Sequence, residues 1–152
     1  MRQLILSRKI PFLLGILIVI LTSCGHIRLI SDYDEITDKT VTALQEKVST
    51  FLVKIESEIG TDESKYENYK QFYLDAKVDL NTLKVRADAI EKNKIVQDQI
   101  TALTSMIDSL EKLHKIGFAS TEQIEALKQP FNSAFTAIIK LQMGLKRGEK
   151  SN

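Results

Sequence analysis

The chain of 152 residues contains no tryptophan, a single cysteine, two prolines and six glycines. One cysteine excludes an internal disulfide, a zinc site built on several thiolates and a Cys-x-x-Cys-His haem attachment. The scarcity of proline and glycine leaves long uninterrupted stretches, which favour helices. Basic and acidic residues nearly balance, at 21 and 20. A surface without one dominant sign of charge does not indicate nucleic-acid binding, so we expect no nucleic-acid partner.

The N-terminus carries basic residues followed by a short apolar run. Arg2, Arg8 and Lys9 precede the apolar residues 10–21. This run is shorter than the stretch of about 20 apolar residues that a membrane-spanning helix needs. Basic residues, a short apolar run and small residues at its end are the features of a secretory signal peptide. We therefore predict that residues 1–23 are a signal peptide that is removed.

The apolar run ends in Leu21-Thr22-Ser23-Cys24, which resembles the lipobox of bacterial lipoproteins. The resemblance implies cleavage between Ser23 and Cys24, attachment of diacylglycerol to the Cys24 sulfur, and acylation of the new amino group. Two or more acyl chains, palmitate among them, hold a protein on a membrane where one chain binds only marginally. The alternative is an ordinary signal peptide with a chance cysteine.

The residue after the cysteine is Gly25. In many Gram-negative bacteria, aspartate at this position retains a lipoprotein in the inner membrane. The resemblance therefore implies a lipid anchor on the periplasmic face of the outer membrane, if the organism is Gram-negative. Residues 24–31 then form a lipidated tether between the membrane and the folded domain.

Residues 32–148 carry apolar side chains at spacings of three and four, which predict four helices. The first runs from 32–34 to 60, the second from 61–62 to 90, the third from a tight turn at 91–94 to 117, and the fourth from 120 to about 146. Gly60 and Gly117 follow the last turns of two helices, as helix-ending glycines do. Ser120 and Gln123 form a capping box, and Pro130 predicts a kink. Residues 149–152 are predicted to be a disordered tail.

Short connections make neighbouring helices antiparallel, so the predicted fold is all-α, an antiparallel up-down-up-down four-helix bundle. The next apolar seam residue, Val96, follows Ile90 by six residues and not by the seven of a heptad. We interpret this change of phase as a turn at 91–94. One alternative is a single bent helix across this turn, which would give three long helices. Another is a trimeric coiled coil built from the same seams.

Glu111 and His114 form a Glu-x-x-His motif, which di-iron bundles use twice, together with two further glutamates. Here the motif occurs once, and the other histidine, His26, lies in the tether. We expect no carboxylate at the buried positions of the seams, and hence no metal and no cofactor. We interpret His114 as a residue at the end of the bundle with a water-exposed edge. No nucleophile and base lie together in the sequence, so the chain is not predicted to be an enzyme.

Two helices carry more apolar surface than one core face requires. Leu74, Val78 and Val85 form a second line on the second helix, and Ile139 and Met143 widen the apolar face of the fourth. A helix facing one core needs an apolar stripe little wider than 100°. Either both helices bury two faces, or these five residues contact a protein partner or a second copy.

Tyr66, Tyr69 and Tyr73 follow one another at helical spacing on the main seam of the second helix. They predict either core packing with hydroxyl groups in water or the lining of a ligand site. The leading hypothesis is a membrane-anchored periplasmic lipoprotein that acts as a non-enzymatic interaction or structural protein of the cell envelope. The alternative is a binding module that holds a small apolar ligand within the bundle.

Overall fold

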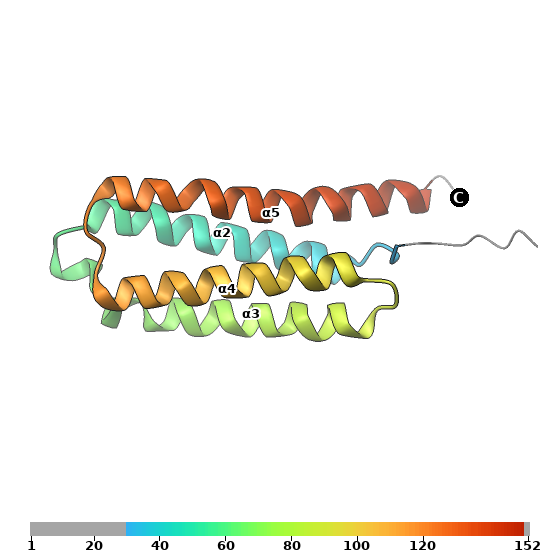
Figure 1. The fold of residues 1–152 in the computed structure, drawn as a ribbon, viewed down its shortest axis with the longest axis horizontal. Helices are drawn as coiled ribbons and strands as arrows, with labels where there is room; N and C mark the ends of the chain where they lie inside the picture. Colours follow the sequence, from blue (N-terminus) through green and yellow to red (C-terminus); the bar gives the residue numbers. More distant parts are fainter. Residues whose placement is uncertain (1–29, 151–152) are drawn as a thin grey trace, which may run out of the picture.

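The structure, a computed structural model, describes residues 30–150. The predictions for the signal peptide, for Ser23 and for Cys24 lie outside the described residues. The described part contains four α-helices: α2 (Glu35–Glu58), α3 (Lys70–Ala89), α4 (Lys94–Ile116) and α5 (Thr121–Lys150). Each helix packs antiparallel against the next, and α2 also packs against α5 (Figure 1). The predicted up-down-up-down four-helix bundle is therefore confirmed.

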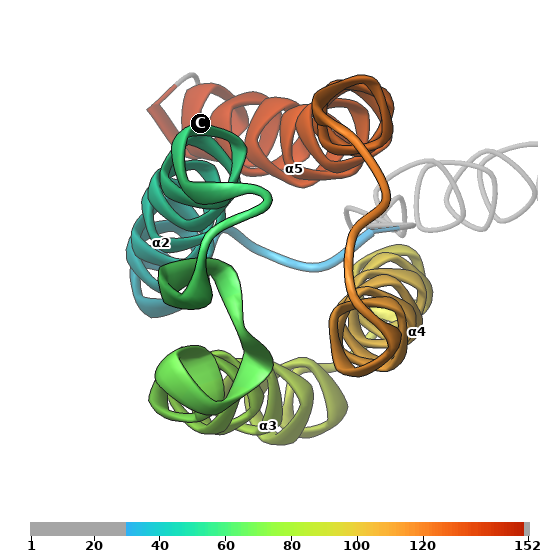
Figure 2. The same ribbon diagram turned by 90° about the vertical axis from the view of Figure 1, so that its left-hand side faces the viewer.

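Seen along its axis, the bundle places α2 opposite α4 and α3 opposite α5 (Figure 2). The core between them is built from apolar residues at spacings of three and four, such as Val41, Leu44 and Val48 of α2. The start of α2, the α3–α4 turn and the end of α5 lie at one end, here called the tether end (Figure 1). The α2–α3 and α4–α5 connections lie at the other, here called the distal end.

The α3–α4 connection is a tight turn at the tether end. Lys92 adopts φ 57°, a left-handed conformation that lets the chain reverse within a few residues. Asn93 is buried, and its side-chain amide donates to the Ala87 carbonyl oxygen at 3.2 Å. The turn predicted at 91–94 is confirmed, and the alternative of three long helices with one bent helix is wrong.

The segment before α3 is not the first part of that helix, as predicted, but two 3₁₀ turns, Asp62–Ser64 and Tyr66–Tyr69. Lys65 between them is extended, with φ −70° and ψ 142°. The Asn68 side chain donates to the Asp62 carbonyl oxygen at 3.0 Å, a local bond that competes with helical pairing. As a result α3 begins eight residues after Asp62, and the predicted start of the second helix is wrong.

The fourth helix is longer than predicted. α5 continues through Pro130 and ends at Lys150, inside the range 149–152 that was predicted to be a disordered tail. Its capping box is formed in part. The backbone N–H of Gln123 donates to the Ser120 hydroxyl at 3.4 Å, but the Gln123 side-chain oxygen accepts from the Ala119 N–H at 2.7 Å, one residue earlier than a capping box requires.

Candidate functional site

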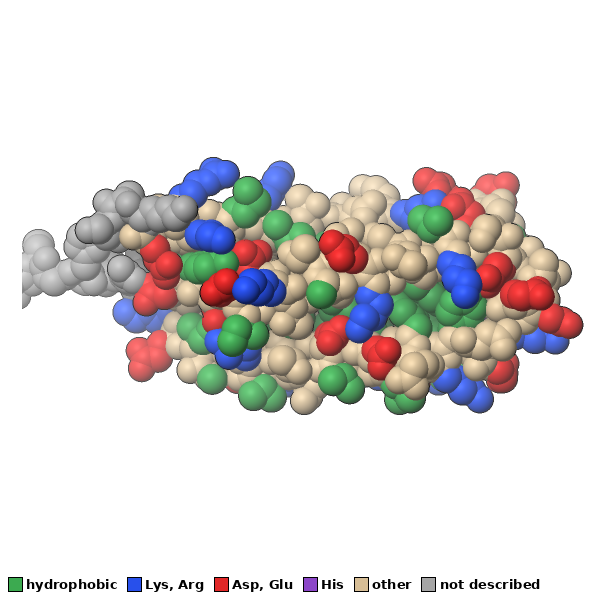
Figure 3. Space-filling view, turned by 180° about the vertical axis from the view of Figure 1, so that it is seen from behind, with side chains coloured by type: hydrophobic (Ala, Val, Ile, Leu, Met, Phe, Trp, Pro, Cys, Tyr) green, Lys and Arg blue, Asp and Glu red, His purple; other side chains and the backbone are tan. Residues whose placement is uncertain are grey.

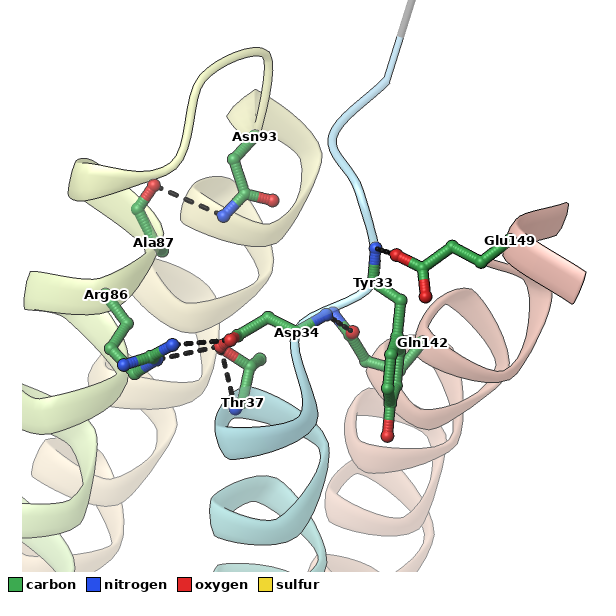
Figure 4. A network of polar contacts seen from close by, with 8 residues as sticks. All are labelled: Tyr33, Asp34, Thr37, Arg86, Ala87, Asn93, Gln142 and Glu149. Atoms are coloured by element: carbon green, nitrogen blue, oxygen red, sulfur yellow. Dashed lines mark hydrogen bonds and ion pairs between the residues drawn. The ribbon is translucent and has the colours of Figure 1, made fainter. Parts of the chain in front are cut away.

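Ser31, the last residue of the predicted tether, is fastened to the tether end of the bundle. Ser31 is 8% exposed, and its hydroxyl donates to the side-chain oxygen of Asn93 at 2.9 Å. Two residues later, the backbone N–H of Tyr33 donates to the Glu149 carboxylate of α5 at 3.1 Å (Figure 4). The predicted tether 24–31 therefore ends in a residue that belongs to the folded bundle.

Asp34 ties three helices together at this end (Figure 4). Its carboxylate caps α2 by accepting from the Thr37 N–H at 2.9 Å, and it accepts from Arg86 Nε of α3 at 2.8 Å. Its own N–H donates to the side-chain oxygen of buried Gln142 of α5 at 3.4 Å. The Arg86 guanidinium and the bonds from Thr37 lower the pKa of Asp34 to about 2 against the opposing effect of burial.

His114 lies in a buried polar cluster at the distal end and is 2% exposed. Its Nδ1 lies 3.0 Å from the Tyr73 hydroxyl, and its Nε2 lies 2.8 Å from the Ser64 carbonyl oxygen. A carbonyl can only accept, so Nε2 carries the proton and Nδ1 accepts from Tyr73. Burial lowers the pKa of His114. The predicted water-exposed edge is wrong, because the segment before α3 covers the ring.

Glu111 is the second member of this cluster and is 8% exposed. The expectation of no carboxylate at a buried position is therefore wrong. The carboxylate accepts from the Tyr66 hydroxyl at 2.7 Å and from Lys77 Nζ at 2.5 Å, and it pairs with Lys115 at 2.9 Å. Burial raises the pKa of Glu111, but these three donors outweigh burial and lower the pKa to about 2. With both oxygens bonded, the group serves the bundle as a fixed ion-pair centre.

The three tyrosines predicted as possible ligand contacts lie together at the distal end. Tyr73 and Tyr69 are buried, Tyr66 is half-buried, and the rings of Tyr69 and Tyr73 lie 5.3 and 5.6 Å from that of Phe51. Each hydroxyl bonds within the protein, to a glutamate or to the His114 ring. The tyrosines thus form a packed aromatic cluster, and each hydroxyl is bonded to another side chain of the bundle.

The predicted partner contacts on α3 are exposed. Leu74, Val78 and Val85 are 58%, 65% and 60% exposed. Figure 3 shows hydrophobic side chains standing out along the edge of the molecule that α3 forms. On α5, Met143 is 46% exposed, whereas Ile139 is partly buried against the core. The interpretation that both helices bury two faces is therefore wrong for α3.

An open apolar groove of about 330 Å³ lies between α4 and α5. These two helices pack less closely against each other than the other neighbouring pairs do. The groove is lined by Met106, Leu110, Leu113, Leu127, Pro130 and Phe131, with Ser105 and Ser109 at its rim. It is an apolar surface that sequence reasoning missed, since neither helix alone shows how far apart the two lie.

Comparisons of the chain with models of protein families, with curated proteins and with solved structures find no match. Within residues 30–150, no helix is both long enough and apolar enough to cross a membrane. In the same range, no group of three or more His, Cys, Asp or Glu side chains is placed to hold a metal ion. What the protein does is therefore inferred from its own residues.

Proposed function

We propose that the protein is a lipid-anchored, non-enzymatic interaction or structural protein of the bacterial cell envelope. In this proposal, residues 1–23 are removed and acyl chains on Cys24 hold the bundle on a membrane, on the periplasmic face of the outer membrane if the organism is Gram-negative. The sides of the bundle are then presented to neighbouring proteins.

The observation that carries the proposal is the fastening of the tether to the bundle. Cys24 and Ser31 are seven residues apart, and seven residues span at most about 25 Å. Because Ser31 bonds to Asn93 at the tether end, this span is the greatest separation between the acylated residue and the bundle. A bundle held so close to lipid headgroups is suited to contact other proteins at the same membrane surface.

The hydrogen bonds of His114 and Glu111 support a role without catalysis. His114 and Glu111, the two residues of the Glu-x-x-His motif, are engaged on every polar atom by bonds within the protein. A general base must reach a substrate proton directly or through one water. Both groups are nearly fully buried, so their bonds stabilise the distal end.

Replacement of the cysteine tests the anchor. Cys24→Ala should leave an uncut precursor that incorporates no labelled palmitate, because the sulfur that would receive the lipid is gone. Ser23→Ala is the matched control: it keeps a small residue before the cleavage site and should be processed and labelled normally. Normal processing and labelling of the Cys24→Ala protein would contradict the proposal.

A second candidate function, a binding module for a small apolar ligand, is favoured by the groove between α4 and α5. The tyrosine cluster is filled by its own aromatic neighbours, so the groove is the better location for such a ligand. A medium-chain fatty acid should then raise the melting temperature of the protein, as any ligand of the folded state does. Leu113→Trp, which narrows the groove, should abolish the rise, and a Tyr66→Phe protein should keep it.

A further inference from the structure

The exposed apolar line of α3 has the heptad spacing of a coiled coil. Leu74, Val78 and Val85 are separated by four and seven residues. With Val78 and Val85 at a positions, Leu74 and Asn81 fall at d positions of the same heptads. Among parallel coiled coils, valine at a with leucine at d favours two strands. The other seam positions of α3, Gln71, Asn81 and Asp88, are polar, so the apolar contact is limited to Leu74, Val78 and Val85. This face lies nearly opposite the buried face of α3, which includes Leu80.

The charges beside this line distinguish the two directions in which two α3 helices could pair. One flank, the g positions, carries Lys70, Lys77 and Lys84, all exposed. Antiparallel pairing brings g positions against g positions and would place lysines against lysines. Parallel pairing brings each g position against the e position five residues on in the other copy, so Lys70 would face Asp75. The charges on the lysine flank therefore favour the parallel arrangement.

Of the three lysines, two are held within their own copy. Lys77 pairs with Glu111 and with Asp108 of α4, and Lys84 pairs with Asp88 one turn along α3. Lys70 lies over the face of the Tyr66 ring, at 5.8 Å from its centre. A carboxylate from a second copy at Lys70 would thus add charge pairing to the end of α3 nearest the distal end of the bundle.

We infer that α3 pairs in parallel with α3 of a second copy anchored in the same membrane. This inference rests on the proposed lipid anchor, because anchoring puts every tether end at the same surface and so makes the bundles parallel. A dimer with its two-fold axis along the bundle would cover the apolar line of each copy. It would also keep the two lysine flanks apart and place both anchors at the same membrane surface. The proposed partner of the exposed α3 face is therefore a second molecule of the same protein.

The pairing is weak away from the membrane. The line from Leu74 to Val85 spans only about 17 Å of helix, and one such face buries far less than the roughly 1,600 Å² of a standard stable interface. Confinement to a membrane raises the effective concentration of the chains, as a linker does for two joined modules. Dimers are thus expected in the envelope and not in dilute solution.

Single cysteines on α3 of the full-length, membrane-bound protein test the pairing. In a parallel dimer every position meets its own number, so Leu74→Cys, Val78→Cys and Val85→Cys should each form a covalent dimer under a mild oxidant. Each should give at least about tenfold more dimer than Ser133→Cys on an exposed face of α5, because pairing holds the thiols at high effective concentration. The substituted residues are exposed, so folding is retained. The unsubstituted chain should give none, since lipid occupies Cys24.

Three results would overturn the inference. They are crosslinking at Val78→Cys alone, which indicates antiparallel pairing; crosslinks to a different protein in place of the dimer; and no crosslink above the Ser133→Cys level. Labelled palmitate measured in the same samples separates this inference from the anchor. Palmitate without dimers refutes the pairing and leaves the anchor in place, whereas dimers without palmitate refute the anchor.

A charge exchange tests the predicted Lys70–Asp75 contact. Lys70→Glu alone should lower the Val78→Cys dimer yield, because it places two carboxylates together across the interface. Asp75→Lys alone should lower it equally by placing two lysines together. The double variant should restore the yield, since it re-creates the pair in reverse. Equal losses in the single and double variants would contradict the parallel register.

Discussion

At the scale of single residues, His114 shows how two bonds fix a proton. Its Nε2 donates to the Ser64 carbonyl, so its Nδ1 is left as the acceptor of the Tyr73 hydroxyl. A second proton on the ring would turn Nδ1 into a donor, so the Tyr73 oxygen would have to accept and the Tyr73 hydroxyl proton would lose its acceptor. Among the charged groups, Glu67 in the segment before α3 acts on the ring and raises the pKa of His114 against the larger effect of burial.

The first prediction concerns the stability of this site in mild acid. Burial lowers the pKa of His114 from an ordinary value of 6.5, so the unfolded chain binds the proton more readily than the folded one. The stability that the uncharged His114 contributes to the fold is then fully present above about pH 6.5 and decreases as the pH falls below this value. We expect the melting temperature to drop between pH 7 and pH 5.

A glutamine at this position separates His114 from other titrating groups. His114→Gln can still donate to Ser64 and accept from Tyr73, but it cannot take up a proton, so its melting temperature should depend less on pH over the same interval. His26→Gln, at the other histidine, should keep the full dependence. An unchanged slope in the His114→Gln protein would show that the acid sensitivity arises elsewhere.

The residues that His114 and Glu111 contact are close in the sequence in some cases and far in others, and only the close ones could be recognised from the sequence. Glu111 and His114 were recognised as one motif because three residues separate them on one helix. The Ser64 carbonyl and Lys77, which determine their chemistry, are 50 and 34 residues away. No local pattern contains these contacts, so both burials were missed.

At the scale of the elements, two glycines with open surroundings predict opposite effects of the same substitution. Gly117 ends α4 at φ 100°, a conformation that side chains with a Cβ rarely adopt, whereas Gly144 lies inside α5. A Cβ at either position meets nothing within 4 Å. Gly117→Ala should therefore destabilise by about 1–3 kcal/mol, and Gly144→Ala should stabilise by about 0.5–1 kcal/mol. Urea denaturation of both variants measures this, and equal shifts would contradict it.

The start of α2 gives the third prediction, through two neighbouring carboxylates. Asp34 is 14% exposed and bonded to Arg86 and Thr37, whereas Glu35 is 64% exposed and pairs only one turn along its own helix, with Lys39. Asp34→Ala should cost about 1–3 kcal/mol, because it removes a cap and leaves the partly buried Arg86 guanidinium without this partner. Glu35→Ala should leave the denaturation midpoint unchanged, as exposed pairs contribute little.

Acid should act on the same contact. The folded-state pKa of Asp34, about 2, lies below its ordinary value of 3.8. Its contribution is therefore present above about pH 4 and is lost as the pH falls toward 2. The Asp34→Asn protein, which cannot titrate, should lose less stability than the unsubstituted chain over this interval. An equal loss in both would place the acid sensitivity on other carboxylates.

The core-facing sides of the helices were predictable because apolar residues that face the core recur every three or four residues. This pattern located α2, α4, α5 and the turn at 91–94. The start of α3 was not predictable on the same grounds. Tyr66 and Tyr69 continue the spacing of Tyr73, yet they lie in a 3₁₀ turn across the distal end. Aromatic packing fills that end with the same residues that a longer helix would have placed on its seam.

At the scale of the whole molecule, an even number of antiparallel helices decides which groups share an end. The start of α2, the α3–α4 turn and the last turn of α5 all lie at the tether end (Figure 1), while His114, in the last turn of α4, lies with its cluster at the distal end. Sequence reasoning predicted this arrangement from the helix count. It missed the Asp34, Arg86 and Gln142 contacts at that end, which join residues 52 and 108 positions apart.

The last prediction uses the length of the bundle to measure its placement on the membrane. α4 has 23 residues and so separates its two ends by about 35 Å. A fluorophore on Lys92→Cys, at the tether end, should be quenched by lipids that carry a quencher on their headgroups. The same fluorophore on Ala119→Cys, at the distal end, should be quenched much less. Both positions are exposed, so labelling leaves the core intact.

The control for this measurement is a short flexible insertion between Gly25 and Ser31, which lengthens the reach of the tether. It should reduce quenching at position 92 while leaving the melting temperature unchanged, because Ser31 still bonds to Asn93. Equal quenching at positions 92 and 119 would mean that the bundle lies along the membrane surface. In that case the short tether would hold the protein close without setting its direction, and two α3 faces could not be parallel by anchoring alone.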